Sequence, residues 1–153
     1  MSKLQINYIG EHKPSLGSLQ ATGYDLRISR IEQKGKLVHI ETDVSIELPP
    51  PNKLHLIDGQ IISFEYVASL LPRSGIASTG WILGNSKGII DADYRGKISA
   101  FFWQVSDIDF PYAIGDRFAQ LVFSFALRAD FFKVNSLSET LRSTGGYGST
   151  GVK

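Results

Sequence analysis

Two carboxylates with a spacing of two residues are the groups in this sequence with the most direct chemical use. Asp91 and Asp93 stand in the segment GIIDADYRG, residues 88–96. On a β-strand, residues i and i+2 point to the same face, so the two carboxylates would be neighbours. A carboxylate beside water can act as a general base and accept the proton of an attacking water molecule. The polar end of a hairpin explains the same residues, and both interpretations stand.

Asn85 lies just upstream of this pair and offers a second kind of chemistry. Its side-chain amide carries both a donor and an acceptor, which suits the edge of a nucleobase. Asparagine is equally common in turns, because it tolerates backbone conformations that most residues avoid.

Two further segments could bind an anion. In LPRSG, residues 71–75, backbone amides and the Ser74 hydroxyl could converge while Arg73 supplies a forked cation. A turn that ends a strand explains the same residues. In GDRFAQL, residues 115–121, Arg117 and Gln120 stand beside an apolar run. Contact with a ligand and an ion pair of Arg117 with Asp116 or another carboxylate explain this arrangement equally well.

The C-terminal segment RSTGGYGSTG, residues 142–151, combines four glycines with Tyr147 and Arg142. Terminal residues are usually disordered unless something holds them, but a tail without a role has no use for the ring or the guanidinium. The glycine spacing of residues 146–151 matches a phosphate-binding P-loop. Val152 stands where that motif needs lysine, so a Walker-type NTPase is excluded.

Composition and charge exclude several classes of site and partner. The three histidines are far apart, so neither a zinc site nor a Ser/His/Asp triad is expected. The sequence has no cysteine, and its 16 Lys+Arg balance 15 Asp+Glu, so no strong field attracts nucleic acid or a membrane. Since no signal peptide or transmembrane stretch stands out, we expect a soluble, intracellular, cytoplasmic protein. A viral chain would act in the cytoplasm or nucleus of its host.

Alternating hydrophobicity predicts mostly β-strands in this 153-residue chain. Between residues 38 and 48 the apolar residues fall on even positions: Val38, Ile40, Val44, Ile46 and Leu48. The even positions are apolar again from 62 to 70, and the odd positions are apolar from 121 to 127. Residues 97–105 are β-branched and aromatic, which predicts a strand buried on both faces. Turn sequences separate these runs at residues 49–52, 58–59, 84–85 and 115–116.

Helical patterns are almost absent from the sequence. SLSE, residues 136–139, fits a helix-capping box, but only a turn or two could follow before Gly145. We therefore predict an all-β domain, a sandwich or jelly roll, over residues 1–128. A flexible C-terminal arm is expected over residues 129–153.

Taken in order, five segments resemble the five motifs of the trimeric deoxyuridine triphosphatases (dUTPases): residues 21–26 (ATGYDL), 72–75 (PRSG), 88–96, 115–121 and 142–151. The resemblance implies a jelly-roll-like subunit in a homotrimer, with three sites at subunit interfaces. It also implies that the C-terminal arm closes over bound nucleotide as a lid.

The resemblance implies a reaction and a set of roles. Asp91 would activate the water that attacks the α-phosphorus of dUTP in line, giving dUMP and diphosphate, which limits uracil in DNA and supplies dUMP. Tyr94 would pack against the deoxyribose, and Tyr147 would stack on uracil. The other residues implied to bind substrate are Arg73, Ser74, Gly75, Asn85, Gly88, Ile90, Gln120, Arg142, Gly148, Ser149 and Thr150.

Mg²⁺ is the implied cofactor, held mainly by the triphosphate and waters. Asp25 would touch the water shell of the metal or brace the trimer, and Arg117 would have a structural or water-mediated role. The link between Pro49 and Pro72 is longer than in typical members of the family, so we expect residues 52–60 to be an inserted surface loop. Two alternatives remain open: a dCTP deaminase on the same fold, and a regulatory nucleotide-binding module without turnover.

Overall fold

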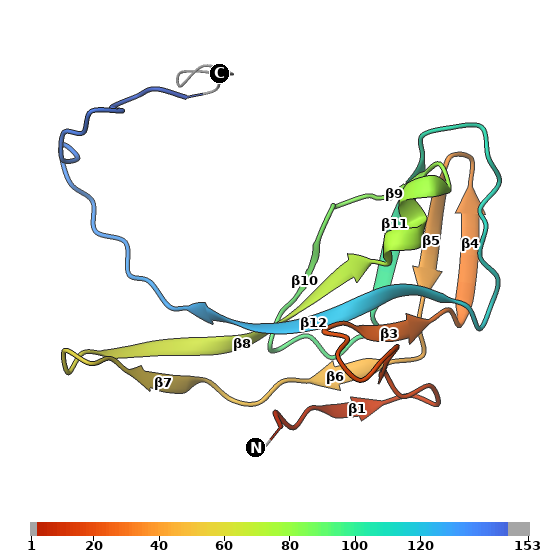
Figure 1. Cartoon of the computed structure of the whole chain (residues 1–153), viewed down its shortest axis with the longest axis horizontal. Helices are drawn as coiled ribbons and strands as arrows, with labels where there is room; N and C mark the ends of the chain where they lie inside the picture. Colours follow the sequence, from red (N-terminus) through yellow and green to blue (C-terminus); the bar gives the residue numbers. More distant parts are fainter. Residues whose placement is uncertain (1–2, 147–153) are drawn as a thin grey trace.

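The computed structural model describes residues 3–146, which form two β-sheets packed through one core, together with a small two-stranded sheet (Figure 1). This arrangement confirms the predicted all-β class. The strands are β1 (Asn7–Ile9), β2 (Ser15–Leu16), β3 (Tyr24–Arg27), β4 (Arg30–Lys34), β5 (Leu37–Glu41), β6 (Ser45–Glu47), β7 (Asn52–His55), β8 (Ile61–Pro72), β9 (Trp81–Leu83), β10 (Gly88–Ile90), β11 (Ser99–Gln104) and β12 (Arg117–Leu127).

Antiparallel pairing links strands that are far apart in the sequence. The larger sheet has the order β10-β8-β12-β3-β2, and β7 also pairs with β8. The second sheet has the order β4-β5-β11-β9, while β1 pairs with β6. β8 and β12 form the longest pairing, from Ala119 opposite Pro72 to Leu127 opposite Phe64. These two long strands place the PRSG and GDRFAQL segments side by side.

The core lies between the two sheets and is built from the alternating apolar positions. Leu26, Leu70 and Leu121 from the larger sheet and Val38 and Phe102 from the smaller one are all fully buried. Each large aliphatic or aromatic side chain removed from water in this way contributes roughly 1.5–3 kcal/mol. This shared core holds the ends of β3, β8 and β12 in fixed relation to one another.

The sequence pattern predicted one strand from the apolar alternation of residues 38–48. The structure has two strands there, and they belong to different sheets. β5 ends at Glu41 and β6 begins at Ser45. Buried Thr42 makes the break, because its hydroxyl donates to the Ile98 carbonyl at 2.9 Å and accepts the Val44 amide at 3.1 Å. The alternate side chains stay buried on both sides of the break, so the pattern indicates burial correctly but hides the turn.

The prediction of a strand buried on both faces at residues 97–105 is also wrong. β11 is buried on one face only, and its outward residues Phe101 and Trp103 are each 48% exposed. The His39 ring stacks on Phe101 with ring centroids 4.4 Å apart. Aromatic residues therefore cover an outer sheet surface here, which composition alone cannot distinguish from a second core face.

The expected surface loop at residues 52–60 is instead part of a hairpin. β7 pairs with β8 from Asn52 opposite Phe64 to His55 opposite Ile61, and the predicted turn follows with Gly59 at φ +82°. In Figure 1 this hairpin and the end of β12 extend together beyond the two-sheet body. β7 pairs with residues 61–64 of β8 and β12 with residues 64–72, so the tip of the extension is a two-stranded hairpin.

Beyond β12 the described chain continues as an extended arm, residues 129–146, in which every residue except Gly145 is exposed. The helical turn predicted after Ser136 does not form; a short 3₁₀ helix occurs instead at Ser74–Ser78. Figure 1 shows the arm curving away from the sheets. Within residues 3–146, no helix is long and apolar enough to cross a membrane.

Candidate nucleotide site

Asp25 is the centre of a charged cluster at one end of the larger sheet. Its carboxylate is 7% exposed and accepts from two arginines: Arg73 Nε lies 3.0 Å from Oδ1, and an Arg117 terminal nitrogen lies 2.9 Å from Oδ2. The three residues meet because β3 pairs with β12, and β8 pairs with β12 on the other side. Of the two sequence interpretations of Arg117, the ion pair is observed, and its carboxylate is Asp25.

A cavity of about 380 Å³ opens beside this cluster. It brings together predicted residues from three segments of the chain, as the phosphate-binding interpretation requires. Arg73 and Arg117 face it with guanidiniums, while Ser74 and Gln120 add a hydroxyl and an amide. Gly75 follows directly, and a Cβ atom placed on it would meet nothing within 4 Å. The full lining is Gly17, Ser18, Ala21, Gly23, Asp25, Arg73, Ser74, Arg117 and Gln120.

The Gln120 side chain lies directly over Gly23, which sequence reasoning did not single out. A Cβ atom on Gly23 would lie 2.1 Å from Gln120 Oε1 and 2.6 Å from its Cδ. Only glycine therefore leaves the glutamine amide where it now borders the cavity. The signal in the sequence was the glycine inside ATGYDL, but its contact is 97 positions away along the chain and depends on the pairing of β3 with β12.

The prediction that Asp91 and Asp93 share one face of a strand is wrong, because β10 ends at Ile90, before either residue. They lie in a turn that is closed by the Tyr94 amide, which donates to the Asp91 carbonyl at 3.1 Å. Both side chains are exposed. The turn presents Asp91 toward solvent, where a water molecule or a ligand can reach it.

Tyr94 is fixed at the end of this turn by its own side chain. Its hydroxyl donates to the Lys97 carbonyl at 3.0 Å, which folds the ring across Gly96. A Cβ atom on Gly96 would lie 2.4 Å from that hydroxyl. The residue remains 43% exposed, so part of its side chain is accessible to a ligand.

Arg95 holds the same turn from its other side, and sequence reasoning missed it. One terminal nitrogen donates to the carbonyls of Ala92 at 2.7 Å and Tyr94 at 3.1 Å, and the other lies 3.3 Å from Glu47 Oε1. Glu47 Oε2 accepts from the Asn7 amide at 2.8 Å. The Asn7 hydrogen bond and the Arg95 charge lower the pKa of Glu47 below its ordinary value of 4.5.

The segment from the connection between β9 and β10 into β10 carries the residues predicted to read a base. Asn85 is exposed at its turn, and its carbonyl accepts the Lys87 amide at 2.5 Å. Gly88 and Ile90 are buried on β10, opposite Leu70 and Ala68 of β8. Their backbones, rather than their side chains, are therefore the groups that could approach a ligand.

The structure does not bring the two predicted halves of the site together within one chain. Ile90 lies opposite Ala68 on β8, and Arg73 follows the far end of the same strand. The five residue steps from Ala68 to Arg73 span roughly 17 Å at about 3.4 Å per step. Asp91 continues in the opposite direction, so one chain separates the acidic turn from the arginine cluster by at least that length of strand.

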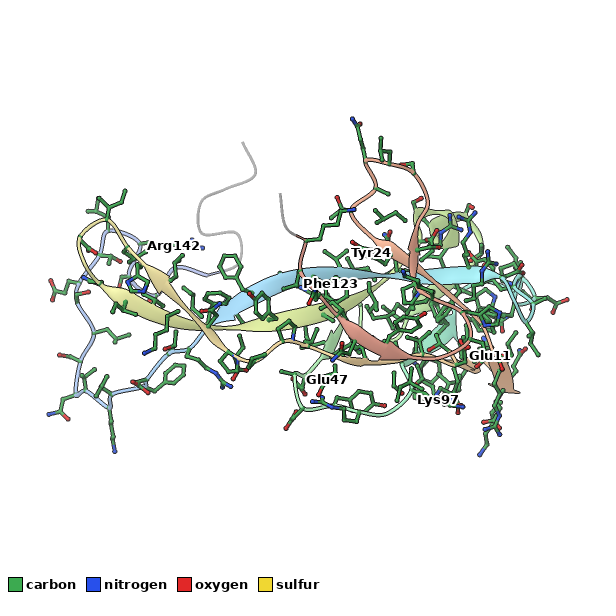
Figure 2. The ribbon with its side chains drawn as sticks, turned by 90° about the horizontal axis from the view of Figure 1, so that it is seen from below. Glu11, Tyr24, Glu47, Lys97, Phe123 and Arg142 are labelled. Atoms are coloured by element: carbon green, nitrogen blue, oxygen red, sulfur yellow. The ribbon has the colours of Figure 1, made fainter. Side chains whose placement is uncertain are left out.

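Arg142 is separated from both halves. Its Nε donates to the Gly145 carbonyl at 3.0 Å within the arm. Figure 2 shows it well apart from Tyr24, the neighbour of Asp25, and from Glu47, which contacts Arg95 in the acidic turn. Tyr147, Gly148, Ser149 and Thr150 lie outside the described residues.

No group of three or more His, Cys, Asp or Glu side chains within residues 3–146 could hold a metal ion. Both oxygens of Asp25, the predicted contact of the metal's water shell, already accept from arginines. A cation here would need most of its oxygen ligands from a bound anion and from water.

Comparison with known proteins agrees with the five motifs. The dUTPase family model matches residues 11–151. The chain is 35% identical over 142 residues to the probable deoxyuridine 5'-triphosphate nucleotidohydrolase of Schizosaccharomyces pombe, covering 91% of this chain and 90% of that protein. It is 38% identical over 144 residues to the deoxyuridine 5'-triphosphate nucleotidohydrolase of Arabidopsis thaliana, covering 91% and 76%.

Solved structures share the fold. A Staphylococcus bacteriophage 80alpha dUTPase with dUPNHPP superposes with a TM-score of 0.71 at 21% identity, covering 99% of this chain and 100% of that one. The EIAV dUTPase superposes with a TM-score of 0.59 at 21% identity, covering 88% and 98%. The resemblance inferred from the motifs is therefore confirmed, and this chain belongs to the dUTPase family.

Proposed function

We propose that this protein hydrolyses dUTP to dUMP and diphosphate, which limits uracil in DNA and supplies dUMP. The observation that carries the proposal is the cavity beside Asp25, where the second and fourth motifs place Arg73, Ser74 and Gln120 together. A cavity lined by fixed guanidiniums, a hydroxyl and an amide suits the α- and β-phosphates of a nucleotide. Family membership supplies the identity of that nucleotide.

Preorganised donors make this half of the site suited to developing negative charge. Asp25 orients Arg73 and Arg117 before substrate arrives, so little reorganisation is needed when charge moves onto the phosphate oxygens. Gly75 lets a phosphate oxygen approach the backbone closely. Ser74 and Gln120 complete the set of donors.

Asp91 is the proposed general base. It takes a proton from a water molecule whose oxygen forms a bond to the α-phosphorus in line, while the bond from that phosphorus to the bridging oxygen breaks and diphosphate leaves with the electron pair. Tyr94 packs against the deoxyribose, where a 2′-hydroxyl would clash. Asn85 and the backbone at Gly88 and Ile90 read the uracil edge.

The separation of the two halves along β8 supports a homotrimer with sites between subunits. Asp91 has to lie within a few ångströms of the phosphate that Ser74 and Gln120 hold, because general-base catalysis requires hydrogen-bond reach. One chain keeps these groups roughly 17 Å or more apart along a strand. A complete site then takes the acidic turn from one copy and the arginine cluster from another.

The arm is proposed to close this shared site. Residues 1–128 would form the β domain, and residues 129–153 would form an arm that caps the γ-phosphate through Arg142, Gly148, Ser149 and Thr150, with Tyr147 stacked on uracil. The exposed, extended course of residues 129–146 supports an arm that reaches another copy.

Mg²⁺ fits this site only as a partner of the triphosphate. Magnesium keeps much of its water and binds substrate phosphates readily, and when bound it supplies charge neutralisation and orients the phosphate chain. Because both oxygens of Asp25 are engaged by arginines, Asp25 is proposed to brace the site, and a contact with the water shell of the metal would require a rearrangement of these pairs.

The first test is diphosphate release in the presence of Mg²⁺, comparing dUTP with dCTP, dTTP and UTP. Turnover of dUTP alone supports the proposal and the assigned base and sugar selection. Ammonia release from dCTP would indicate a deaminase on the same fold. Tight dUTP binding without turnover would indicate a regulatory nucleotide-binding module.

A mixing experiment tests the shared site separately. Asp91→Asn and Gln120→Ala variants, each impaired alone, are unfolded and refolded together. If Asp91 and Gln120 act from different copies, mixed trimers contain some sites with both residues intact, and activity returns. If both residues act from one chain, the mixture stays as impaired as its parts.

A further inference from the structure

The turn that carries Asp91 is held mainly by the side chain of Arg95, the residue that directly follows Tyr94. Its own backbone contributes the bond from the Tyr94 amide to the Asp91 carbonyl. Arg95 adds two charge-assisted bonds, to the carbonyls of Ala92 and Tyr94. These acceptors lie directly after Asp91 and within Tyr94, so the guanidinium fixes the backbone between the two residues proposed to act on substrate.

The guanidinium is in turn held by two strands that take no part in the site. Glu47, in β6, faces the far side of Arg95 at 3.3 Å and is oriented by Asn7, in β1, at 2.8 Å. Glu47 is labelled in Figure 2. Asn7 precedes residue 11, where the match to the family model begins. The chain of contacts therefore couples the acidic turn to an N-terminal strand outside the matched region.

We propose that Arg95 is a positioning residue for Asp91, and that Glu47 and Asn7 form a relay that holds Arg95 in place. This inference rests on the proposed function of Asp91. Lysine cannot replace the arginine fully, because a single ammonium lacks the planar fork that reaches two carbonyls and a carboxylate at once.

The effect is expected in kcat rather than in KM. Phosphate binding belongs to the distant cluster around Asp25, and the Tyr94 ring has its own anchor at the Lys97 carbonyl. Misplacing a catalytic group by about 1 Å can cost roughly 100-fold in rate. We expect Arg95→Met to lower kcat about 10- to 100-fold, with little change in KM. Glu47→Gln and Asn7→Ala should give progressively smaller losses, and Arg95→Lys should recover part of the rate.

The experiment measures kcat and KM for dUTP in the full-length protein, together with hydrogen exchange at the Tyr94 amide. Arg30→Met is the matched control, because Arg30 is similarly exposed and pairs with Glu32 and Glu41 on β4 and β5, away from the turn. We expect faster exchange at Tyr94 and a lower kcat in Arg95→Met, with neither change in Arg30→Met.

Three outcomes separate this inference from the proposed function. Normal kcat and unchanged Tyr94 exchange in Arg95→Met would overturn the relay. If Arg95→Met unfolds, kcat and Tyr94 exchange in Glu47→Gln test the relay instead, and normal values of both would overturn it. If the wild-type protein releases no diphosphate from dUTP, the proposed function fails, while Tyr94 exchange still decides whether Arg95 and Glu47 hold the turn.

Discussion

The cluster around Asp25 and the turn at residues 91–97 are the two halves of the proposed site, and the chain holds them in different ways. Asp25 is buried on β3, where Arg117 of the adjacent β12 and Arg73, which directly follows β8, converge on it. Asp91 is exposed in a turn that is kept in shape by Arg95 and the Tyr94 hydroxyl. The first half is built into the sheet, whereas the second is attached to its edge.

The difference follows from what each half has to do. A phosphate-binding cluster benefits from fixed charges in a partly desolvated setting, and a buried carboxylate between two arginines supplies them. A general base has to meet water and a substrate held by another copy, so it belongs on an exposed turn. Damage to the first half should therefore appear in stability and KM, and damage to the second half in kcat.

The largest effect is expected at the turn. Asp91→Asn should keep the fold and nucleotide binding while lowering kcat by about 10²- to 10⁴-fold, the usual contribution of a general base. Steady-state kinetics and dUTP binding measure the two parts. Asp93→Asn is the matched control, since Asp93 is exposed in the same turn. Equal losses in the two variants would mean that the charge of the turn matters rather than a base at Asp91.

Asp25→Asn should give the next largest effect, and it should appear first in stability. Removing a buried partner typically costs about 3–5 kcal/mol, but Arg73 and Arg117 are 36% and 41% exposed, so water will screen part of the loss. We expect about 2 kcal/mol, which lowers Tm by roughly 4–8 °C for a chain of this size. KM for dUTP should rise because Arg73 is no longer oriented. Thermal unfolding and kinetics test both, and an unchanged Tm would contradict the assigned brace.

Glu32→Gln is the control for this comparison. Glu32 pairs with Arg30 on the exposed face of β4, where an ion pair contributes about 0–1 kcal/mol. If the two carboxylate variants shift Tm equally, burial is not what distinguishes the Asp25 cluster.

Local patterns in the sequence were sufficient to predict the all-β class, the long strands β8 and β12, and the glycine turns. The five motifs were sufficient to predict the family. Periodicity failed where a buried polar side chain changed the chain direction: Thr42 splits one apolar alternation into β5 and β6 while every second residue stays buried. Composition failed at β11, because Phe101 and Trp103 look like core residues and yet face outward.

The candidate site was predictable as a set of residues but not as an arrangement. Arg73, Ser74 and Gln120 come together because β8 and β12 pair, which no local pattern specifies. Arg95 was missed because its partner Glu47 is 48 positions away and each residue alone resembles an ordinary surface charge. The helical turn predicted from the capping box at Ser136 does not form, because the arm does not pack against the rest of the chain. A short helix is only marginally stable without such packing.

A smaller effect is expected from Gly23→Ala, which sharpens the comparison within the first half. The added methyl group would displace Gln120, whose Oε1 lies 2.1 Å from the position of the new Cβ. We expect KM for dUTP to rise by up to about tenfold, equivalent to 1.4 kcal/mol, with kcat less affected. A double-mutant cycle with Gln120→Ala is the measurement. If the glycine acts through the glutamine, Gly23→Ala should add little once Gln120 is gone; additive losses would indicate another cause.

The smallest effect is expected at Asp43, a partly buried carboxylate outside the site that holds a loop by accepting from backbone amides. Burial alone would raise the pKa of Asp43, but the amides of His12 and Glu11 and the His12 ring outweigh it and lower the pKa below its ordinary 3.8. A lowered pKa means that the charged form is favoured in the folded state, so this stabilisation is complete above about pH 5 and is lost as pH falls through the folded-state value.

Asp43→Asn should therefore cost about 1 kcal/mol at pH 7, and the difference from wild type should shrink toward pH 3. Urea unfolding of both proteins between pH 7 and pH 3 measures this. A difference that stayed constant with pH would assign the effect to packing of the loop instead of to the charged carboxylate. Of the two carboxylates that hold loops, only Glu47, through Arg95, would then remain as an example of stabilisation by charge.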